Sequence, residues 1–262
     1  MSADFIVVLV FILFSVVVAW KDKMLSSSGA IMAFIVGGCI ALGFGIEGLF
    51  LLGVFFISSS LLSKFNKKKK RRLEDIHEKG STRDWAQVLA NGGIAAAFGI
   101  ATFWWDSPIF ILALGISLAS ANSDTWASEL GALSRRPPIS IRGLKRVDTG
   151  TSGAISLWGT IAGFFGSMLI AGVATLIFQL NLESFIVILL FGFIGMFIDT
   201  IFGAYLQAEF ICAKCGRHIE KRLHCQVEAV LCKGHSWIRN DTVNFISSLS
   251  AVLLGLFLYS GF

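Results

Sequence analysis

Hydrophobic residues in this chain are gathered into eight apolar runs, and nearly all charged residues lie between them. The runs cover residues 4–20, 29–45, 47–63, 85–105, 108–123, 153–178, 184–206 and 242–261. A membrane-spanning helix needs about 20 predominantly apolar residues, and most runs are near that length. The pattern predicts an all-α, polytopic membrane bundle of about eight transmembrane helices, some short or broken, in a single domain of residues 1–262.

The basic residues divide the loops into two classes. All 22 Lys and Arg residues follow the first, third, fifth or seventh run, and the other loops and both termini carry none. Cytoplasmic loops of membrane proteins are enriched in Lys and Arg. Loops 64–84, 124–152 and 207–241 are therefore predicted to be cytoplasmic, and both termini are predicted to lie outside.

Composition narrows the class of protein further. A hydrophobic content of 55% excludes an ordinary soluble domain. The net charge of +5 belongs to the predicted cytoplasmic face, where it suits anionic lipid headgroups, phosphorylated ligands or nucleotide. We expect a bacterial or archaeal cell membrane protein that does not bind nucleic acid. The sequence leaves its oligomeric state open.

Asp199 is the most informative single residue. It follows ten apolar residues and lies well inside the seventh run. A carboxylate at the centre of a span costs about 2.5–3.5 kcal/mol on insertion scales, so such residues are candidates for function. The structural alternative is a hydrogen bond to Ser or Thr on a neighbouring helix.

The densest polar cluster comes at the end of the fifth run. On a helix, Asn122 and Glu129 share one face, and Asp124 and Ser128 share the adjacent face. Neighbouring carboxylates suit Mg²⁺, which takes oxygen ligands and usually bridges to substrate phosphates. The structural alternative is the start of an amphipathic helix beyond the membrane.

Polar residues also open the fourth and eighth runs. Arg83 and Asn91 belong to a stripe at helical spacing that enters the fourth run, and Asp241 and Asn244 share a face at the start of the eighth. Polar side chains inside a span must face protein or water. These residues are further candidates for the same site.

A glycine-containing loop leads into the sixth run. Gly150, Thr151, Ser152 and Gly153 follow the basic residue Lys145. Free backbone N–H groups at a helix N-terminus form an anion site. The loop is either a phosphate-binding loop or a plain turn, and it is not a Walker A sequence.

Small residues recur along two helix faces. They are Gly153, Ser156, Thr160, Gly163 and Ser167 in the sixth run, and Gly195, Gly203 and Gln207 beside Asp199 in the seventh. Such faces allow helices to approach closely in lipid, so tight packing is the first interpretation.

Four of the five cysteines lie in the loop 207–241. Cys212 and Cys215 have the Cys-x-x-Cys spacing of a zinc ribbon. Cys225 would be the third ligand of a structural Zn²⁺, with either His224 or Cys232 as the fourth. The alternative is reduced thiols without metal, as expected in the cytoplasm.

Together these motifs resemble the transmembrane protein 19-like family (domain of unknown function 92), which includes plant phytyl-phosphate kinase. The resembling segments are 71–76, 83–84, 87–93, 121–131, 150–153, 199–200, 203–204, 207, 240–241 and 243–245. The match runs from about residue 64 to the end of the chain. The family usually shows Gly-Thr-Asn-Gly-Gly where this chain has Gly-Thr-Ser-Gly-Ala at 150–154.

The resemblance implies transfer of a phosphoryl group from a nucleoside triphosphate, CTP among the candidates, to an isoprenoid (phytyl or prenyl) monophosphate, giving the diphosphate. It implies that Mg²⁺ is held by carboxylates and that basic side chains and the glycine loop hold phosphates. The implied roles are Mg²⁺ binding by Asp124, Glu129, Asp199 and Asp241; phosphate binding by Arg83, Lys145 and residues 150–153; and orientation of substrate or nucleotide by Asn91, Asn122, Gln207 and Asn244.

Two other functions stay open from the sequence. Asp199 and the abundant glycine are also typical of a transporter or flippase for a phosphorylated lipid. A lipid-headgroup transferase that uses CTP would share the nucleotide and Mg²⁺ but would release pyrophosphate.

Overall fold

The computed structural model describes residues 3–65, 75–76, 78–105 and 107–259. Its helices are α1 (Ala3–Lys21), α2 (Ser27–Lys64), α4 (Trp85–Ala101), α5 (Ile109–Gly131), α6 (Leu157–Ile177), α7 (Leu182–Tyr205) and α8 (Asn240–Tyr259). Its strands are β1 (Ile139–Ser140), β2 (Ala154–Ile155), β3 (Glu209–Cys212), β4 (His218–Ile219), β5 (Leu223–His224) and β6 (Val227–Lys233). The basic run and family motif at 66–74 lie outside the described residues.

The predicted helical membrane bundle is confirmed. Within the described residues, five helices are long and apolar enough to cross a membrane (α2, α5, α6, α7 and α8), and α1 and α4 are shorter apolar helices. The helix α2 is broken at Gly45, where φ is 64° and ψ is −155°. Lys64 Nζ donates to the carbonyl oxygen of Asp22 at 3.3 Å, so both ends of α2 lie at the same end of the bundle. The break separates the two runs predicted as separate spans, 29–45 and 47–63.

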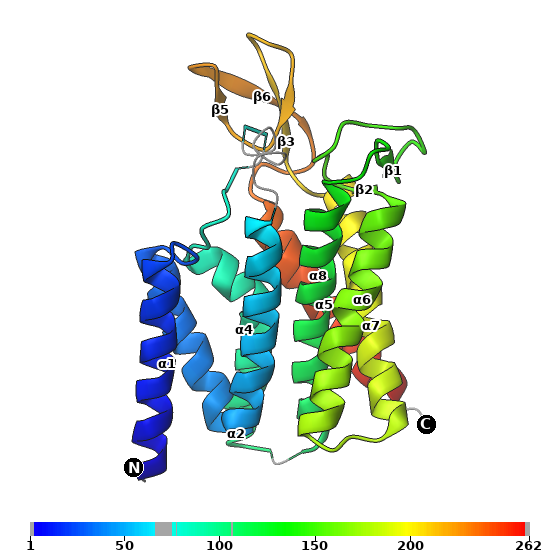
Figure 1. The fold of residues 1–262 in the computed structure, drawn as a ribbon. Helices are drawn as coiled ribbons and strands as arrows, with labels where there is room; N and C mark the ends of the chain where they lie inside the picture. The colour runs from blue at the N-terminus through cyan, green and yellow to red at the C-terminus, as the bar shows by residue number, and fades with distance from the viewer. Residues whose placement is uncertain (1–2, 66–74, 77, 106, 260–262) are drawn as a thin grey trace.

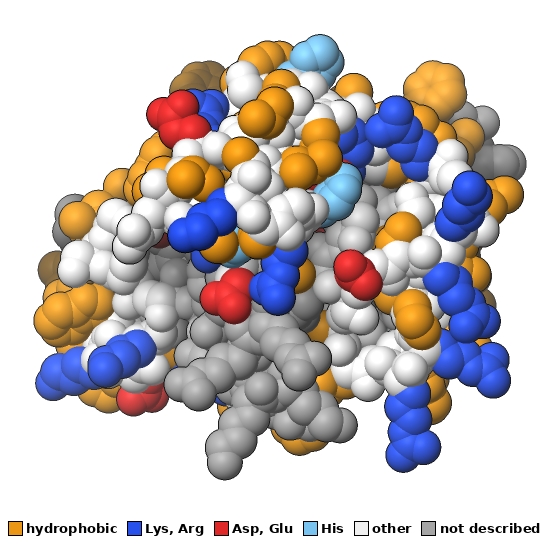
Figure 2. All heavy atoms as spheres, turned by 90° about the horizontal axis from the view of Figure 1, so that it is seen from above, with side chains coloured by type: hydrophobic (Ala, Val, Ile, Leu, Met, Phe, Trp, Pro, Cys, Tyr) orange, Lys and Arg blue, Asp and Glu red, His pale blue; other side chains and the backbone are white. Residues whose placement is uncertain are grey.

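The polar segments gather at one end of the molecule. Figure 1 shows the strands at one end of the bundle, whereas α1 begins and α8 ends at the opposite end. Seen from the strand-bearing end, Lys and Arg side chains are spread over much of the face (Figure 2). This arrangement matches the separation of basic loops from termini that the sequence predicts. The assignment of this end to the cytoplasm stays a prediction.

The helix α5 occupies the centre of the bundle. It packs against α2, α4, α6, α7 and α8. Of its most apolar stretch, 67% is buried inside the protein, against 28–39% for the other four long helices. Ser117, Ser120, Asn122 and Ser123 are buried on it. Because protein rather than lipid surrounds α5, it crosses the bundle with the lowest hydropathy of the five.

Small residues allow the helices to approach closely. A Cβ on Gly163 of α6 would clash with Met196 of α7, and a Cβ on Gly195 of α7 would clash with Ser120 of α5. Between α2 and α4, a Cβ on Gly99 would clash with the carbonyl oxygen of Cys39. The small-residue faces of the sixth and seventh runs are therefore packing surfaces.

The strands belong to the loops and not to the membrane bundle. β1 and β2 form an antiparallel pair that flanks residues 141–153. The loop between α7 and α8 forms a four-stranded antiparallel sheet with the order β4-β3-β6-β5. We call residues 206–239 the insert.

We predict that Gly99→Ala destabilises the protein by about 1–3 kcal/mol, because the methyl group overpacks the contact with the α2 backbone. Gly172→Ala is the matched control, because a Cβ there has nothing within 4 Å and alanine favours the helix. Thermal unfolding in detergent should show a lower midpoint for the first variant and an equal or higher midpoint for the second. Equal midpoints for the two variants would contradict the packing assignment.

Candidate functional site

One polar cavity of about 370 Å³ lies at the strand-bearing end of the bundle. Eleven residues that the sequence singled out line it: Arg83, Asn91, Asp124, Glu129, Gly150, Thr151, Ser152, Gly153, Asp199, Asp241 and Asn244. They come from α4, α5, α7, α8 and the loops before α4 and α6. The fold therefore gathers polar segments that are far apart in the sequence around one space.

Three helices begin at this cavity. The lining includes Gln87 near the start of α4, Gly159 near the start of α6 and Asn240 at the start of α8. Asp84 caps α4 by accepting from the backbone N–H of Gln87 at 3.0 Å, and Ser156 caps α6 by accepting from that of Gly159 at 3.1 Å. The positive ends of three helix dipoles thus surround the cavity and favour an anionic ligand.

Among the described residues, six acidic side chains line the cavity: Glu78, Asp124, Glu129, Asp199, Glu220 and Asp241. Asp124 of α5 and Asp199 of α7 form one pair within this set. They lie close enough for their charges to repel each other. Asp199 accepts a hydrogen bond from Ser247 Oγ at 3.0 Å and, with the Asn244 amide turned to satisfy its neighbours, from the Asn244 nitrogen at 2.9 Å. The structural hydrogen bond considered for Asp199 is therefore present, but Asp199 also faces the cavity.

The other two carboxylates predicted to bind Mg²⁺ have protein partners. Glu129 accepts a hydrogen bond from Ser63 Oγ, and Asp241 forms an ion pair with Lys79. Within the described residues, no three carboxylates have oxygens within 4.8 Å of one another. All four carboxylates line the same cavity, and their assignment to Mg²⁺ stays a prediction.

Three basic side chains line the cavity, and the sequence analysis singled out only Arg83. Arg83 Nη2 donates to Ser59 Oγ at 2.8 Å, and its guanidinium lies over two phenylalanine rings of α2. Lys79 and Arg239 were missed. Lys79 lies a few residues before α4, and Arg239 immediately precedes α8. A search for basic residues just before the two runs that open with polar residues would have found both.

Lys79 and Arg239 already have carboxylate partners. Lys79 Nζ lies 2.7 Å from Asp84 Oδ2 and also pairs with Asp241. Burial acts to lower the pKa of Lys79, but hydrogen bonds to both carboxylates outweigh it and raise the pKa. Arg239 pairs with Glu78. Lys79 is therefore held in the charged form beside the cavity.

The backbone of Arg83 is fixed by the linker between α1 and α2. Its N–H donates to the carbonyl oxygen of Met24 at 2.9 Å, and its carbonyl oxygen accepts from the N–H of Ser26 at 2.9 Å. A Cβ on Gly29 would clash with that carbonyl. A glycine at the start of α2 therefore permits the close approach that positions Arg83.

The glycine loop is held against α7 and the insert. Gly153 has φ of 79°, and a Cβ there would clash with Ala204. Ser152 Oγ donates to Gln207 Oε1 at 2.8 Å, and Lys233 Nζ donates to the carbonyl oxygen of Ser152 at 3.4 Å. These contacts define the conformation in which the loop faces the cavity.

Three residues expected at the site do not line the cavity. Asn122 is fully buried, and it donates to the carbonyl oxygen of Gly166 at 2.8 Å and accepts from Ser58 at 3.0 Å. Gln207 lies behind the glycine loop and supports it. Lys145 is exposed in the segment between β1 and β2. The structure therefore places Asn122 between helices, Gln207 against the glycine loop and Lys145 outside the lining, and their binding roles stay predictions.

The insert brings its Cys and His residues into two groups. The ligand atoms of Cys212, Cys215, His224 and Cys225 all lie within 4.8 Å of one another. Cys232 instead lies with Glu209 and His218. Of the two alternatives for a fourth ligand, the geometry favours His224.

These features define a polytopic helical membrane protein with a polar cavity at the strand-bearing end of the bundle. The chain belongs to the family described as Integral membrane protein DUF92, whose profile matches residues 10–252. The family resemblance inferred from the motifs is confirmed.

Relatives cover most of the chain. It is 33% identical to Protein PGR of Arabidopsis thaliana over 258 residues, which is 88% of each chain. It is 29% identical to Uncharacterized membrane protein MJ0933 of Methanocaldococcus jannaschii, covering 91% of this chain and 87% of that one. It is 26% identical to Protein VTE6, chloroplastic, of Arabidopsis thaliana, covering 89% of this chain and 66% of that one. No solved structure matches.

We predict that Asn122→Ala lowers the free energy of unfolding by about 1–3 kcal/mol, because it removes the hydrogen bonds of a buried amide that join α5 to α2 and α6. Asn91→Ala is the control: its amide donates to Gln87 of its own helix and lines the cavity. Thermal unfolding should show a large loss for the first variant and a small one for the second. An unchanged midpoint for Asn122→Ala would refute its role in packing.

Proposed function

We propose that this protein is an integral membrane kinase that transfers a phosphoryl group from a nucleoside triphosphate to an isoprenoid monophosphate. The observation that carries the proposal is the convergence of three helix N-termini, three basic side chains and the carboxylates of Asp124 and Asp199 on one cavity. Phosphoryl transfer requires positioning and charge neutralisation, and this set of groups supplies both. The family and the relationship to Protein VTE6, chloroplastic, support a reaction on a prenyl phosphate.

The pair Asp124 and Asp199 suits Mg²⁺. Both offer hard oxygen donors, and the repulsion between them is relieved by a divalent cation. Mg²⁺ is commonly held by one or two carboxylates and completes its shell with water and substrate phosphates. When bound, it would neutralise phosphate charge during transfer.

The basic side chains have separate tasks in this proposal. Arg83 is held by Ser59 and the phenylalanine rings, and it presents a fixed guanidinium to a phosphate oxygen. Lys79 lies between the carboxylates of Asp84 and Asp241, and Arg239 pairs with Glu78, so these two cations offset part of the negative charge of the cavity wall. The glycine loop and the start of α6 add backbone N–H donors.

The position of the cavity suits an amphiphilic substrate. The cavity lies where helices end, so the isoprenoid tail can remain among apolar helix surfaces while its phosphate enters the polar space. The attacking phosphate oxygen is already anionic, so the reaction does not depend on a strong general base.

We expect Asp124→Asn and Asp199→Asn each to lower turnover at least about 100-fold, because each removes a charge needed at the transferring phosphate. Protein in nanodiscs would receive Mg²⁺, each nucleoside triphosphate labelled in the γ-phosphate, and a set of prenyl monophosphates. Label should appear in a prenyl diphosphate. Asp148→Asn is the matched control, because it makes the same change at an exposed carboxylate in the loop between α5 and α6, outside the cavity.

The same assay separates the alternatives. Release of pyrophosphate with nucleotide joined to lipid would identify a headgroup transferase. If folded protein transfers label with no pair of nucleotide and acceptor, the kinase proposal is wrong. Movement of a labelled lipid phosphate across a vesicle bilayer would then favour a flippase. Full turnover in both aspartate variants would contradict the assignment of Asp124 and Asp199 as Mg²⁺ ligands.

A further inference from the structure

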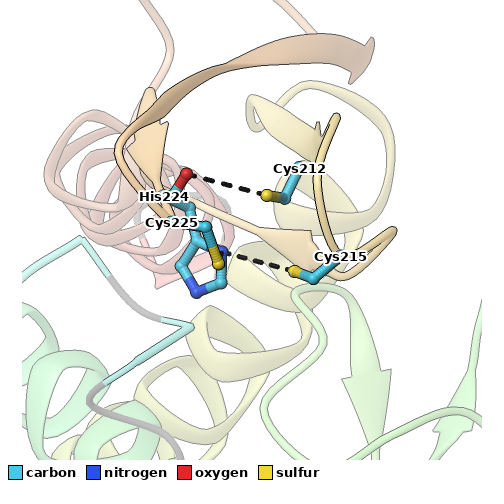
Figure 3. Close-up of side chains that lie close together, drawn as sticks. All are labelled: Cys212, Cys215, His224 and Cys225. Carbon is cyan, nitrogen blue, oxygen red and sulfur yellow. Dashed lines mark hydrogen bonds between the residues drawn. The ribbon is translucent and has the colours of Figure 1, made fainter.

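The insert between α7 and α8 carries two turns whose tips meet. Cys212 ends β3, and Cys215 lies in the turn from β3 to β4. His224 ends β5, and Cys225 begins the turn from β5 to β6. Figure 3 shows the two pairs of side chains facing each other, one pair from each turn. Two pairs of residues, separated from each other by at least nine positions in the sequence, are thus placed as one group of four.

The distances within this group fit a tetrahedral ion. His224 Nδ1 lies 3.5 Å from Cys215 Sγ and 3.3 Å from Cys225 Sγ. A zinc ion bound at about 2.3 Å to sulfur and about 2.0–2.1 Å to nitrogen holds those two atoms about 3.6 Å apart. Three thiols and one imidazole form a common ligand set of structural zinc sites.

Both turns are shaped to present their sulfur atoms inward. In the first, Gly216 has φ of 71° and its N–H donates to the carbonyl oxygen of Cys212 at 2.9 Å. In the second, Cys225 and Gln226 have φ of 51° and 63°, the conformation of a type I′ turn. That turn favours Asn and Gly, so Cys-Gln there is unfavourable for the backbone alone. The local strain is compensated if the thiol of Cys225 gains a strong partner.

The insert has little else to hold it together. Its core consists of only four buried apolar side chains, namely Ala208, Phe210, Cys212 and Ile219. Units this small usually need a metal or disulfides to be stable. All five cysteines of the chain are free thiols, so disulfides do not fill this need.

We propose that Cys212, Cys215, His224 and Cys225 bind one structural Zn²⁺ that joins the two turns of the insert. The second group, Glu209, His218 and Cys232, has a different explanation. Glu209 pairs with His218 at 2.7 Å and with Lys233 at 3.0 Å, so its carboxylate is already balanced. Cys232 is therefore left outside the zinc site.

The zinc site supports the wall of the polar cavity. Between its two turns lies Glu220, which lines the cavity and accepts from Gln207 Nε2 at 2.8 Å. The N–H of Glu220 donates to the carbonyl oxygen of Ile76 at 2.9 Å. The ion would therefore fix the segment that connects the insert to the loop before α4 and to the glycine loop.

The first test uses wild-type protein and measures alkylation of each cysteine by mass spectrometry. Cys215, Cys225 and Cys232 are all exposed, so without a metal they should react at similar rates. With Zn²⁺ bound, we expect Cys215 and Cys225 to react at least about tenfold more slowly than Cys232, and a chelator should remove the difference. Equal rates for folded protein after incubation with Zn²⁺ would overturn the proposal.

The second test measures bound zinc by elemental mass spectrometry after incubation with Zn²⁺ and removal of the excess. We expect one zinc per chain in the wild type and in Cys232→Ser, the matched control, and at least a tenfold loss in Cys215→Ser and Cys225→Ser. Loss in Cys232→Ser, or full retention in both cluster variants, would refute the ligand set. Neither readout depends on kinase activity, so the zinc site and the proposed function can fail separately.

Discussion

Polar groups on α5 can cross the membrane only because other helices enclose them. In lipid, an unsatisfied amide or hydroxyl is costly. Asn122 is therefore matched to Gly166 of α6 and Ser58 of α2, and Ser123 Oγ donates to the carbonyl oxygen of Gly163 at 2.9 Å. These bonds require close helix approach, which small residues permit. The packing of the whole bundle follows from this need to surround a polar central helix.

The same constraint places the site. The polar face of α5 continues to the strand-bearing end, where Asp124 and Glu129 reach the cavity. The neighbouring α4, α6 and α8 begin at that level, and their free N–H groups need anions, caps or water. Carboxylates inside the cavity and positive helix ends around it therefore form one electrostatic unit. In our proposal, a divalent cation would bind the carboxylates and a phosphate would bind at the positive helix ends.

The insert completes the cavity from outside the membrane. Gln207 and Lys233 fasten the glycine loop, and Glu220 reaches the lining. The insert is too small to be rigid by hydrophobic packing. Its conformation is held by hydrogen bonds to neighbouring segments and, in our proposal, by zinc bound to its Cys and His residues. The stability of the insert and the geometry of the glycine loop are therefore coupled through a few polar contacts.

From the sequence alone we could predict the apolar segments, the helical class, the separation of the basic loops from the termini and eleven of the residues that line the cavity. Run length, charge bias and helical spacing are local properties, so they can be read without a fold. Only the tertiary structure decided which partner each polar side chain meets: Asp241 with Lys79, Glu129 with Ser63, Asn122 between helices. It also left Lys145 exposed and separated Cys232 from the other cysteines. These outcomes depend on the rotation and closure of distant segments against one another, which no local pattern specifies.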